Sequence, residues 1–103
     1  MSGILLILYS REGCCLCEGL RQRLMDLSLE ALNPPIKLTV IDIDAPETSK
    51  VDKDRYDLQV PVMVLYLDKI NQKFELPRVS PRLTQESLFL WLQKAISKIL
   101  ELT

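Results

Sequence analysis

Histidine is absent from the chain, and a surplus of charge of either sign is lacking as well. Without histidine, a serine or cysteine nucleophile has no imidazole base, and zinc sites with mixed cysteine and histidine ligands are excluded. The 13 lysine and arginine residues are balanced by 14 aspartate and glutamate residues. A chain so close to neutral has no electrostatic reason to bind nucleic acid or an anionic membrane, and we expect neither as a partner.

Long apolar segments are missing too. The N-terminal apolar run spans only Ile4 to Leu8, and no basic residue precedes it. Such a run is too short for a signal peptide or a membrane-spanning helix. The three cysteines crowd together near the N-terminus, whereas a secreted disulfide framework spaces them along the chain. We therefore expect a protein of the reducing cytoplasm, folded as one domain over residues 1–103.

Hydrophobic patterns along the chain predict an α/β fold. Ile4 to Tyr9 is typical of a strand buried on both faces of a sheet. Leucines at helical spacing follow the cysteines, until Asn33 and the two prolines after it end the helix. The other ranges we predict are 36–44, 60–67 and 73–76 for strands, and 44 to about 56 or 58 and from Thr84 onward for helices.

The predicted element order is β-α-β-α-β-β-α. A short first crossover makes the first two strands parallel, and a hairpin makes the last two antiparallel. Asp44 is expected to cap the second helix, because an early proline and an acidic residue follow it. Thr84 is expected to open the third helix, which carries an apolar stripe from Leu88 to Ile99. The result is a mixed four-stranded sheet with helices on both faces.

The most informative motif is Cys14-Cys15-Leu16-Cys17, directly after the first strand. Residues three apart on a helix share one face, close enough for the roughly 4.4–6.8 Å between Cα atoms that a disulfide needs, so we expect Cys14 and Cys17 to form the redox pair. At a helix start, free backbone N–H groups and the helix dipole stabilise a thiolate. Cys14 is therefore the expected catalytic nucleophile, and Cys17, one turn inside, is the expected resolving thiol.

The role of Cys15 stays open at this point. Its side chain diverges from those of Cys14 and Cys17, so we do not expect it to pair with either. Three interpretations are open: a third redox thiol, a glutathionylation site, or a small hydrophobe that fills a gap. The chain has no second cysteine pair, and we expect no metal bound by the monomer.

Four features together resemble the glutaredoxin-type members of the thioredoxin fold. They are a first strand that ends in Tyr9-Ser10, a basic residue at Arg11, the Cys14/Cys17 pair, and Val60-Pro61 before the third strand. The order of elements agrees over nearly the whole chain. The likeness is greatest to small bacterial glutaredoxin-like proteins.

The resemblance implies that the Val60–Pro61 bond is cis and lies beside the cysteines, and that the backbone of Val60 pairs with a bound thiol-bearing peptide. It also implies that Arg11 contacts an anionic group and that glutathione is a candidate electron donor. The family's Gly-Gly turn after the hairpin is missing, because no glycine occurs after the redox helix. Arg78 or Arg82, in the loop 76–82 that replaces the turn, are the candidates to take over its contacts.

These features predict a thiol–disulfide oxidoreductase. The Cys14 thiolate attacks a disulfide, in a protein or in a glutathione mixed disulfide, and Cys17 resolves the intermediate. Electrons are expected from glutathione or from a thioredoxin reductase, with no bound cofactor. Two alternatives stay open: an iron–sulfur cluster carrier that uses Cys14 in a dimer, and a redox-inactive interaction module with the thioredoxin fold.

Overall fold

The computed structural model describes residues 3–80 and 82–102, and its elements follow the predicted order. The strands are β1 (Ile4–Ser10), β2 (Lys37–Asp42), β3 (Val62–Leu67) and β4 (Gln72–Glu75). The α-helices are α1 (Cys15–Asp26), α2 (Lys50–Tyr56) and α3 (Gln85–Leu102), and single-turn 3₁₀ helices are η1 (Leu29–Ala31) and η2 (Asp68–Ile70). This order confirms the α/β fold expected from the sequence.

The four strands form one mixed sheet in the order β2-β1-β3-β4. β1 pairs in parallel with β2 and antiparallel with β3, and β3 pairs antiparallel with β4. In this register Leu38, Leu6, Leu65 and Phe74 lie side by side across the sheet and point to the same face. β1 is a central strand, which explains why its sequence is apolar on both faces.

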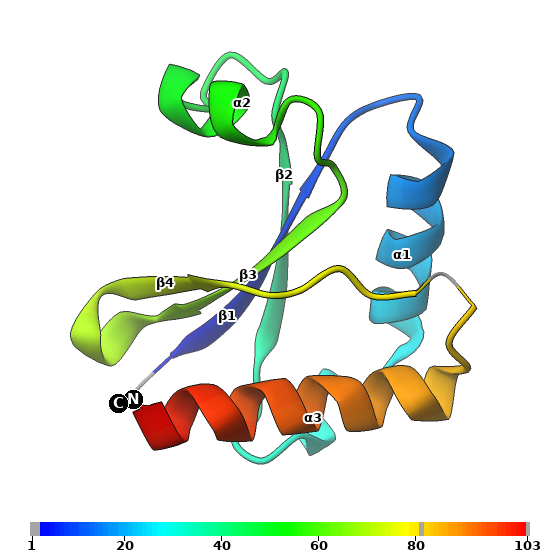
Figure 1. Ribbon diagram of the computed structural model, residues 1–103, viewed down its shortest axis with the longest axis vertical. Coiled ribbons are helices and arrows are strands. Elements are labelled where there is room, and N and C mark those ends of the chain that lie inside the picture. Colours follow the sequence, from blue (N-terminus) through cyan, green and yellow to red (C-terminus); the bar gives the residue numbers. More distant parts are fainter. Residues whose placement is uncertain (1–2, 81, 103) are drawn as a thin grey trace.

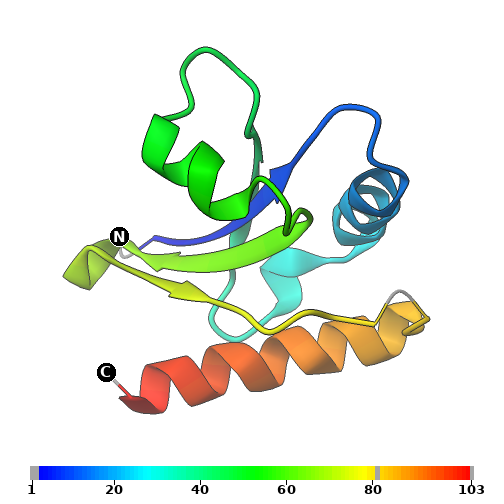
Figure 2. The same cartoon turned by 45° about the horizontal axis from the view of Figure 1, so that its top comes forward.

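Helices cover both faces of the sheet (Figure 1 and Figure 2). α1 and α3 pack on the face that carries Leu6 and Leu8. α2 covers the opposite face, where Ile7 and Tyr9 meet Tyr56. Because β1 is buried on both sides, its C-terminal end gives a firm support to the loop that follows it.

The second helix differs from the prediction. α2 begins at Lys50 rather than near Asp44, because the hydroxyl of Ser49 accepts a hydrogen bond from the N–H of Asp52 at 3.2 Å and caps the helix. The carboxylate of Asp44 forms an ion pair with Arg11 instead. The prediction that Asp44 caps this helix is therefore wrong.

The first helix is shorter than its leucine spacing predicts. α1 ends at Asp26, and the extended Leu27 leads into η1. Leu29 and Leu32 are buried against the core from this separate turn. Leucines that have the spacing of a longer helix thus reach the core by a different route. Where a strand begins or ends at a different residue than predicted, the difference is one or two residues.

The third helix begins where the sequence predicts. The hydroxyl of Thr84 accepts a hydrogen bond from the N–H of Ser87 at 3.1 Å, as an N-cap does. The predicted apolar stripe is buried at Leu88, Leu92, Ile96 and Ile99. Neither α3 nor any other helix in residues 3–80 and 82–102 is long and apolar enough to cross a membrane.

Gly13 and Gly19 offer a matched pair of substitutions. Gly13 has a φ of +84°, whereas Gly19 lies inside α1, and a Cβ at either position would meet no atom within 4 Å. We expect Gly13→Ala to lower the free energy of unfolding by about 1 kcal/mol, because alanine is strained at this φ. Gly19→Ala should raise it by about 0.5–1 kcal/mol, because alanine favours the helix. Urea denaturation measures both changes, and a stabilising Gly13→Ala would contradict this account.

Candidate functional site

Cys14 is the N-cap residue of α1. Its backbone is extended, with φ −89° and ψ 108°, and its Sγ accepts a hydrogen bond from the N–H of Cys17 at 3.1 Å. The N–H of Cys14 donates to the carbonyl of Arg11 at 3.2 Å, which closes the turn that contains Gly13. The sulfur thus takes the place of a capping oxygen at the positive end of the helix dipole. A negative charge on this sulfur is stabilised there.

Cys14 and Cys17 differ in their access to solvent. They form a disulfide with Cα atoms 5.2 Å apart, within the usual range. Cys17 is completely buried, whereas Cys14 is partly exposed. Of this pair, only Cys14 is therefore within reach of another molecule. This asymmetry is what the predicted roles of nucleophile and resolving thiol require.

Cys15 is an exposed free thiol. It lines a cleft of about 430 Å³ together with Leu16 and Pro61. Leu16 exposes 59% of its surface, so the wall beside the thiol is apolar. The structure excludes the interpretation of Cys15 as a hydrophobe that fills a gap in the core. Cys15 is therefore an accessible thiol on the wall of the cleft.

Val60 and Pro61 connect α2 to β3, and the peptide bond between them is cis. Pro61 lines the cleft beside Cys15. The N–H of Val60 donates to the carbonyl of Tyr56 at 3.2 Å, so it is not available to a bound peptide. A peptide strand that pairs with Val60 must therefore use the Val60 carbonyl.

Arg11 lies in the loop after β1, and its guanidinium group meets acidic partners. Its Nε donates to the carboxylate of Asp44 at 2.8 Å, and one terminal nitrogen forms an ion pair with the carboxylate of Asp57. The other terminal nitrogen donates to the carbonyl of Asp57 at 3.0 Å. Lys53 adds a second cation, with its Nζ 3.3 Å from the Asp44 carboxylate. A substrate anion at Arg11 would have to compete with both carboxylates.

We call Arg11, Asp44, Lys53 and Asp57 the Arg11 cluster. It ties the loop after β1 to α2 and to the segments before and after this helix. The hydrogen bond from Arg11 is the main reason that the pKa of Asp44 lies below its ordinary value of 3.8. No sequence signal marks Asp57 as a partner, because it lies 46 residues after Arg11.

The two arginines expected to replace the missing turn are placed differently. Arg78 lines the cleft beside Cys15, and its Nη2 donates to the carbonyl of Gln59 at 2.6 Å. Arg82 is exposed in the loop before α3 and is not part of the cleft wall. Pro81, in the same loop, lies outside the described residues. Of the two, Arg78 is the one that shares a cleft with Cys15.

Tyr9 packs at the end of β1. Only 1% of its surface is exposed, and its ring stacks on that of Tyr56 with centroids 4.4 Å apart. Burial raises the pKa of Tyr9 to about 12, with smaller contributions from Asp52 and Tyr56. Its hydroxyl therefore keeps its proton at neutral pH, and the stacked, buried ring makes Tyr9 a packing residue at the end of the strand.

The fold and the cysteine pair define a thioredoxin-fold protein whose cysteines stand at disulfide distance, an arrangement that fits an oxidoreductase. A thioredoxin from Thermus thermophilus is similar, with a TM-score of 0.64 and 18% identity over 93% of this chain and 75% of its own. Trxlp from Edwardsiella tarda EIB202 has a TM-score of 0.57 and 16% identity over 87% and 82%. A malarial protein has a TM-score of 0.58 and 16% identity over 89% and 96%. These similarities show the fold.

The family is more specific than the fold. Residues 5–93 match the family model described as Glutaredoxin-like domain (DUF836), and the chain belongs to this family. The resemblance noted from the strand, the cysteines and Val60-Pro61 is thereby confirmed. A comparison with curated proteins finds no match.

Asp44 offers a direct test of the Arg11 cluster. We expect its pKa in the folded protein to lie below 3.8, and Arg11→Gln to move it back toward 3.8, because the main hydrogen bond is lost. Since folding lowers this pKa, the stabilisation is present above the ordinary value and is lost as the pH falls through the folded value. NMR titration of the side-chain carboxyl carbon measures both values. Lys53→Gln, which removes the weaker partner, is the control and should shift the pKa less.

Proposed function

We propose that the protein is a thiol–disulfide oxidoreductase in which Cys14 is the nucleophile and Cys17 the resolving thiol. The observation that carries this proposal is the N-cap position of Cys14, whose Sγ accepts from the N–H of Cys17 while Cys17 itself is buried. A helix N-terminus stabilises the thiolate, which is the form of cysteine that attacks a disulfide. Membership in a glutaredoxin-like family supports the same chemistry.

The proposed reaction begins with the reduced pair. The Cys14 thiolate attacks one sulfur of a substrate disulfide, a mixed disulfide forms, and the other substrate sulfur leaves as a thiolate and takes up a proton. Cys17 then loses its proton and attacks the Cys14 sulfur, which releases the second substrate thiolate. The substrate is reduced and the Cys14–Cys17 pair is oxidised to a disulfide. A thiol reductant must supply the electrons that restore the pair.

Glutathione is the reductant we propose, with thioredoxin reductase as the other candidate. Two cationic side chains support glutathione, because Arg23 and Arg78 line the cleft beside Cys15 and suit its carboxylates. The substrate is a protein disulfide or a glutathione mixed disulfide. Such chemistry belongs in a reducing compartment, and we propose the cytoplasm.

An iron–sulfur carrier or an interaction module would use the same fold differently. The carrier would hold its cluster through Cys14 of two subunits and glutathione thiols, and Cys17 would have no part in it. In an interaction module, neither cysteine would take part in the function. A buried Cys17 one helical turn from a partly exposed Cys14 favours the oxidoreductase, because it is the only one of the three that uses both thiols.

Reduction of a glutathione mixed disulfide, with glutathione and glutathione reductase for recycling, tests the proposal. We expect Cys14→Ser to abolish turnover, because the nucleophile is lost. Cys17→Ser should keep this activity, since glutathione itself resolves the intermediate, but should lose the reduction of a protein disulfide such as those of insulin. Cys15→Ser is the matched control and should keep both activities.

Three results would change the account. Turnover that survives Cys14→Ser would show that the nucleophile is assigned to the wrong residue. If the wild-type protein is inactive with glutathione but is recycled by thioredoxin reductase, the proposed oxidoreductase activity stands and the electron donor is thioredoxin reductase. Inactivity with both donors would favour the interaction module.

A further inference from the structure

The outer edge of β2 has no neighbouring strand in the described part of the chain. β2 stands first in the sheet order β2-β1-β3-β4, and its inner edge pairs with β1. An exposed edge presents N–H and C=O groups that form a template for another strand. Which of these groups are still available decides what kind of strand fits.

Hydrogen bonding alternates along β2. The N–H of Ile43, just after the strand, donates to the carbonyl of Ser10 at 2.9 Å. The odd-numbered residues of this segment therefore direct their backbone groups toward β1. By the same alternation, Leu38, Val40 and Asp42 direct their N–H and C=O groups to the outer edge.

Both ends of this edge are partly occupied within the chain. Ile36, just before β2, also belongs to the outward series, and its N–H donates to the carbonyl of Leu29 at 3.3 Å. At the other end, the carbonyl of Asp42 accepts from the Thr48 hydroxyl at 2.6 Å and from the N–H of Ala45 at 3.1 Å. A partner strand therefore cannot use the N–H of Ile36 at the start of the edge or the carbonyl of Asp42 at its end.

We propose that this edge pairs with the same edge of a second copy of this chain, β2 against β2 in antiparallel orientation, with Thr39 opposite the partner's Thr39. Leu38 then exchanges both backbone hydrogen bonds with the partner's Val40, and Val40 does so with the partner's Leu38. The N–H of Asp42 donates to the carbonyl of the partner's Ile36. A twofold axis through Thr39 repeats every one of these bonds, which gives a closed dimer.

The pattern of occupied groups favours a second copy over an unrelated strand. In this register Ile36 faces the partner's Asp42, and the two groups that form no bond there are the Ile36 N–H and the Asp42 carbonyl. These are the two groups that the chain already satisfies internally. With Val40 opposite itself, the N–H of Leu38 would meet the occupied Asp42 carbonyl. The register centred on Thr39 therefore leaves no outward group of this segment without a partner.

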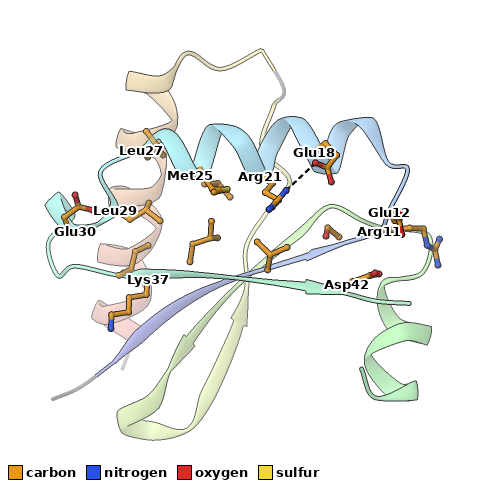
Figure 3. Close-up of a pocket in the computed structure, with 15 residues that line it drawn as sticks. Arg11, Glu12, Glu18, Arg21, Met25, Leu27, Leu29, Glu30, Lys37 and Asp42 are labelled. Atoms are coloured by element: carbon orange, nitrogen blue, oxygen red, sulfur yellow. Dashed lines mark ion pairs between the residues drawn. The ribbon is translucent and has the colours of Figure 1, made fainter. Parts of the chain in front are cut away.

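Side chains beside the edge support the same pairing. Leu38 packs against the core on the α1 side of the sheet, and Val40, two residues on, points to the same face. Both line a groove of about 970 Å³ between α1 and β2, together with Met25, which is labelled in Figure 3. Met25 exposes 56% of its surface and Val40 exposes 38%. In the proposed dimer Leu38 lies across from the partner's Val40 on this face, an apolar cross-strand pair. Apolar surface that is open in one copy is thereby covered.

Sedimentation equilibrium of the reduced protein over a concentration series tests the dimer. We expect the mass to rise toward twice the 11.8 kDa of one chain. Val40→Pro should shift the equilibrium to the monomer, because it removes an outward N–H while the bonds to β1 stay intact. Circular dichroism checks that this variant is folded. A wild-type monomer at every concentration would overturn the proposal, and so would a dimer that Val40→Pro leaves unchanged.

Cross-linking tests the register in a chain whose Cys14, Cys15 and Cys17 are replaced by serine. Thr39→Cys would face its own copy in a non-hydrogen-bonded pair with Cα atoms about 4.5 Å apart, within reach of a disulfide. Lys37→Cys is the matched control, exposed on the same face but about 13 Å from its own copy. Mild oxidation should give a covalent dimer from Thr39→Cys alone. No cross-link from Thr39→Cys, or equal yields from both variants, would overturn the proposed register.

Discussion

The site depends on one constraint, the position of Cys14 as the N-cap of α1. β1 is buried on both faces and determines where the chain leaves the sheet, and the turn at Gly13 brings Cys14 to the helix start. There the N–H of Cys17 donates to the Cys14 sulfur. The same helical turn buries Cys17, so a short segment provides one accessible and one protected thiol at bonding distance.

Different interactions hold the two sides of this segment. On the α2 side, the Arg11 cluster uses charges to tie the loop after β1 to its neighbours. On the other side, an apolar cleft runs beside Cys15 and Pro61, with Arg78 fixed on the carbonyl of Gln59. The charged side is occupied by the protein's own carboxylates. The cleft is thus the side that offers open apolar surface and a nearby cation.

Local order around the cysteines was predictable because it depends on short-range patterns: an apolar strand, two cysteines three residues apart, and leucines at helical spacing. The cap at Thr84 was predictable for the same reason. Long-range contacts were not. Asp44 is a residue type that often caps helices, but it forms an ion pair with Arg11 instead. No local sequence pattern identifies Asp57 as the second partner of Arg11. The bond from the Val60 N–H to Tyr56 likewise depends on how the chain bends before Pro61.

Relative thiol reactivity tests the central claim most directly. Two single-thiol variants of the reduced protein would be compared, one that keeps Cys14 and one that keeps Cys15, and their alkylation by iodoacetamide measured at neutral pH. Cys15 is the more exposed thiol, whereas the Cys14 sulfur has the helix N-terminus and the N–H of Cys17. The account predicts that Cys14 reacts several-fold faster, because more of it is thiolate. Equal rates, or a faster Cys15, would contradict it.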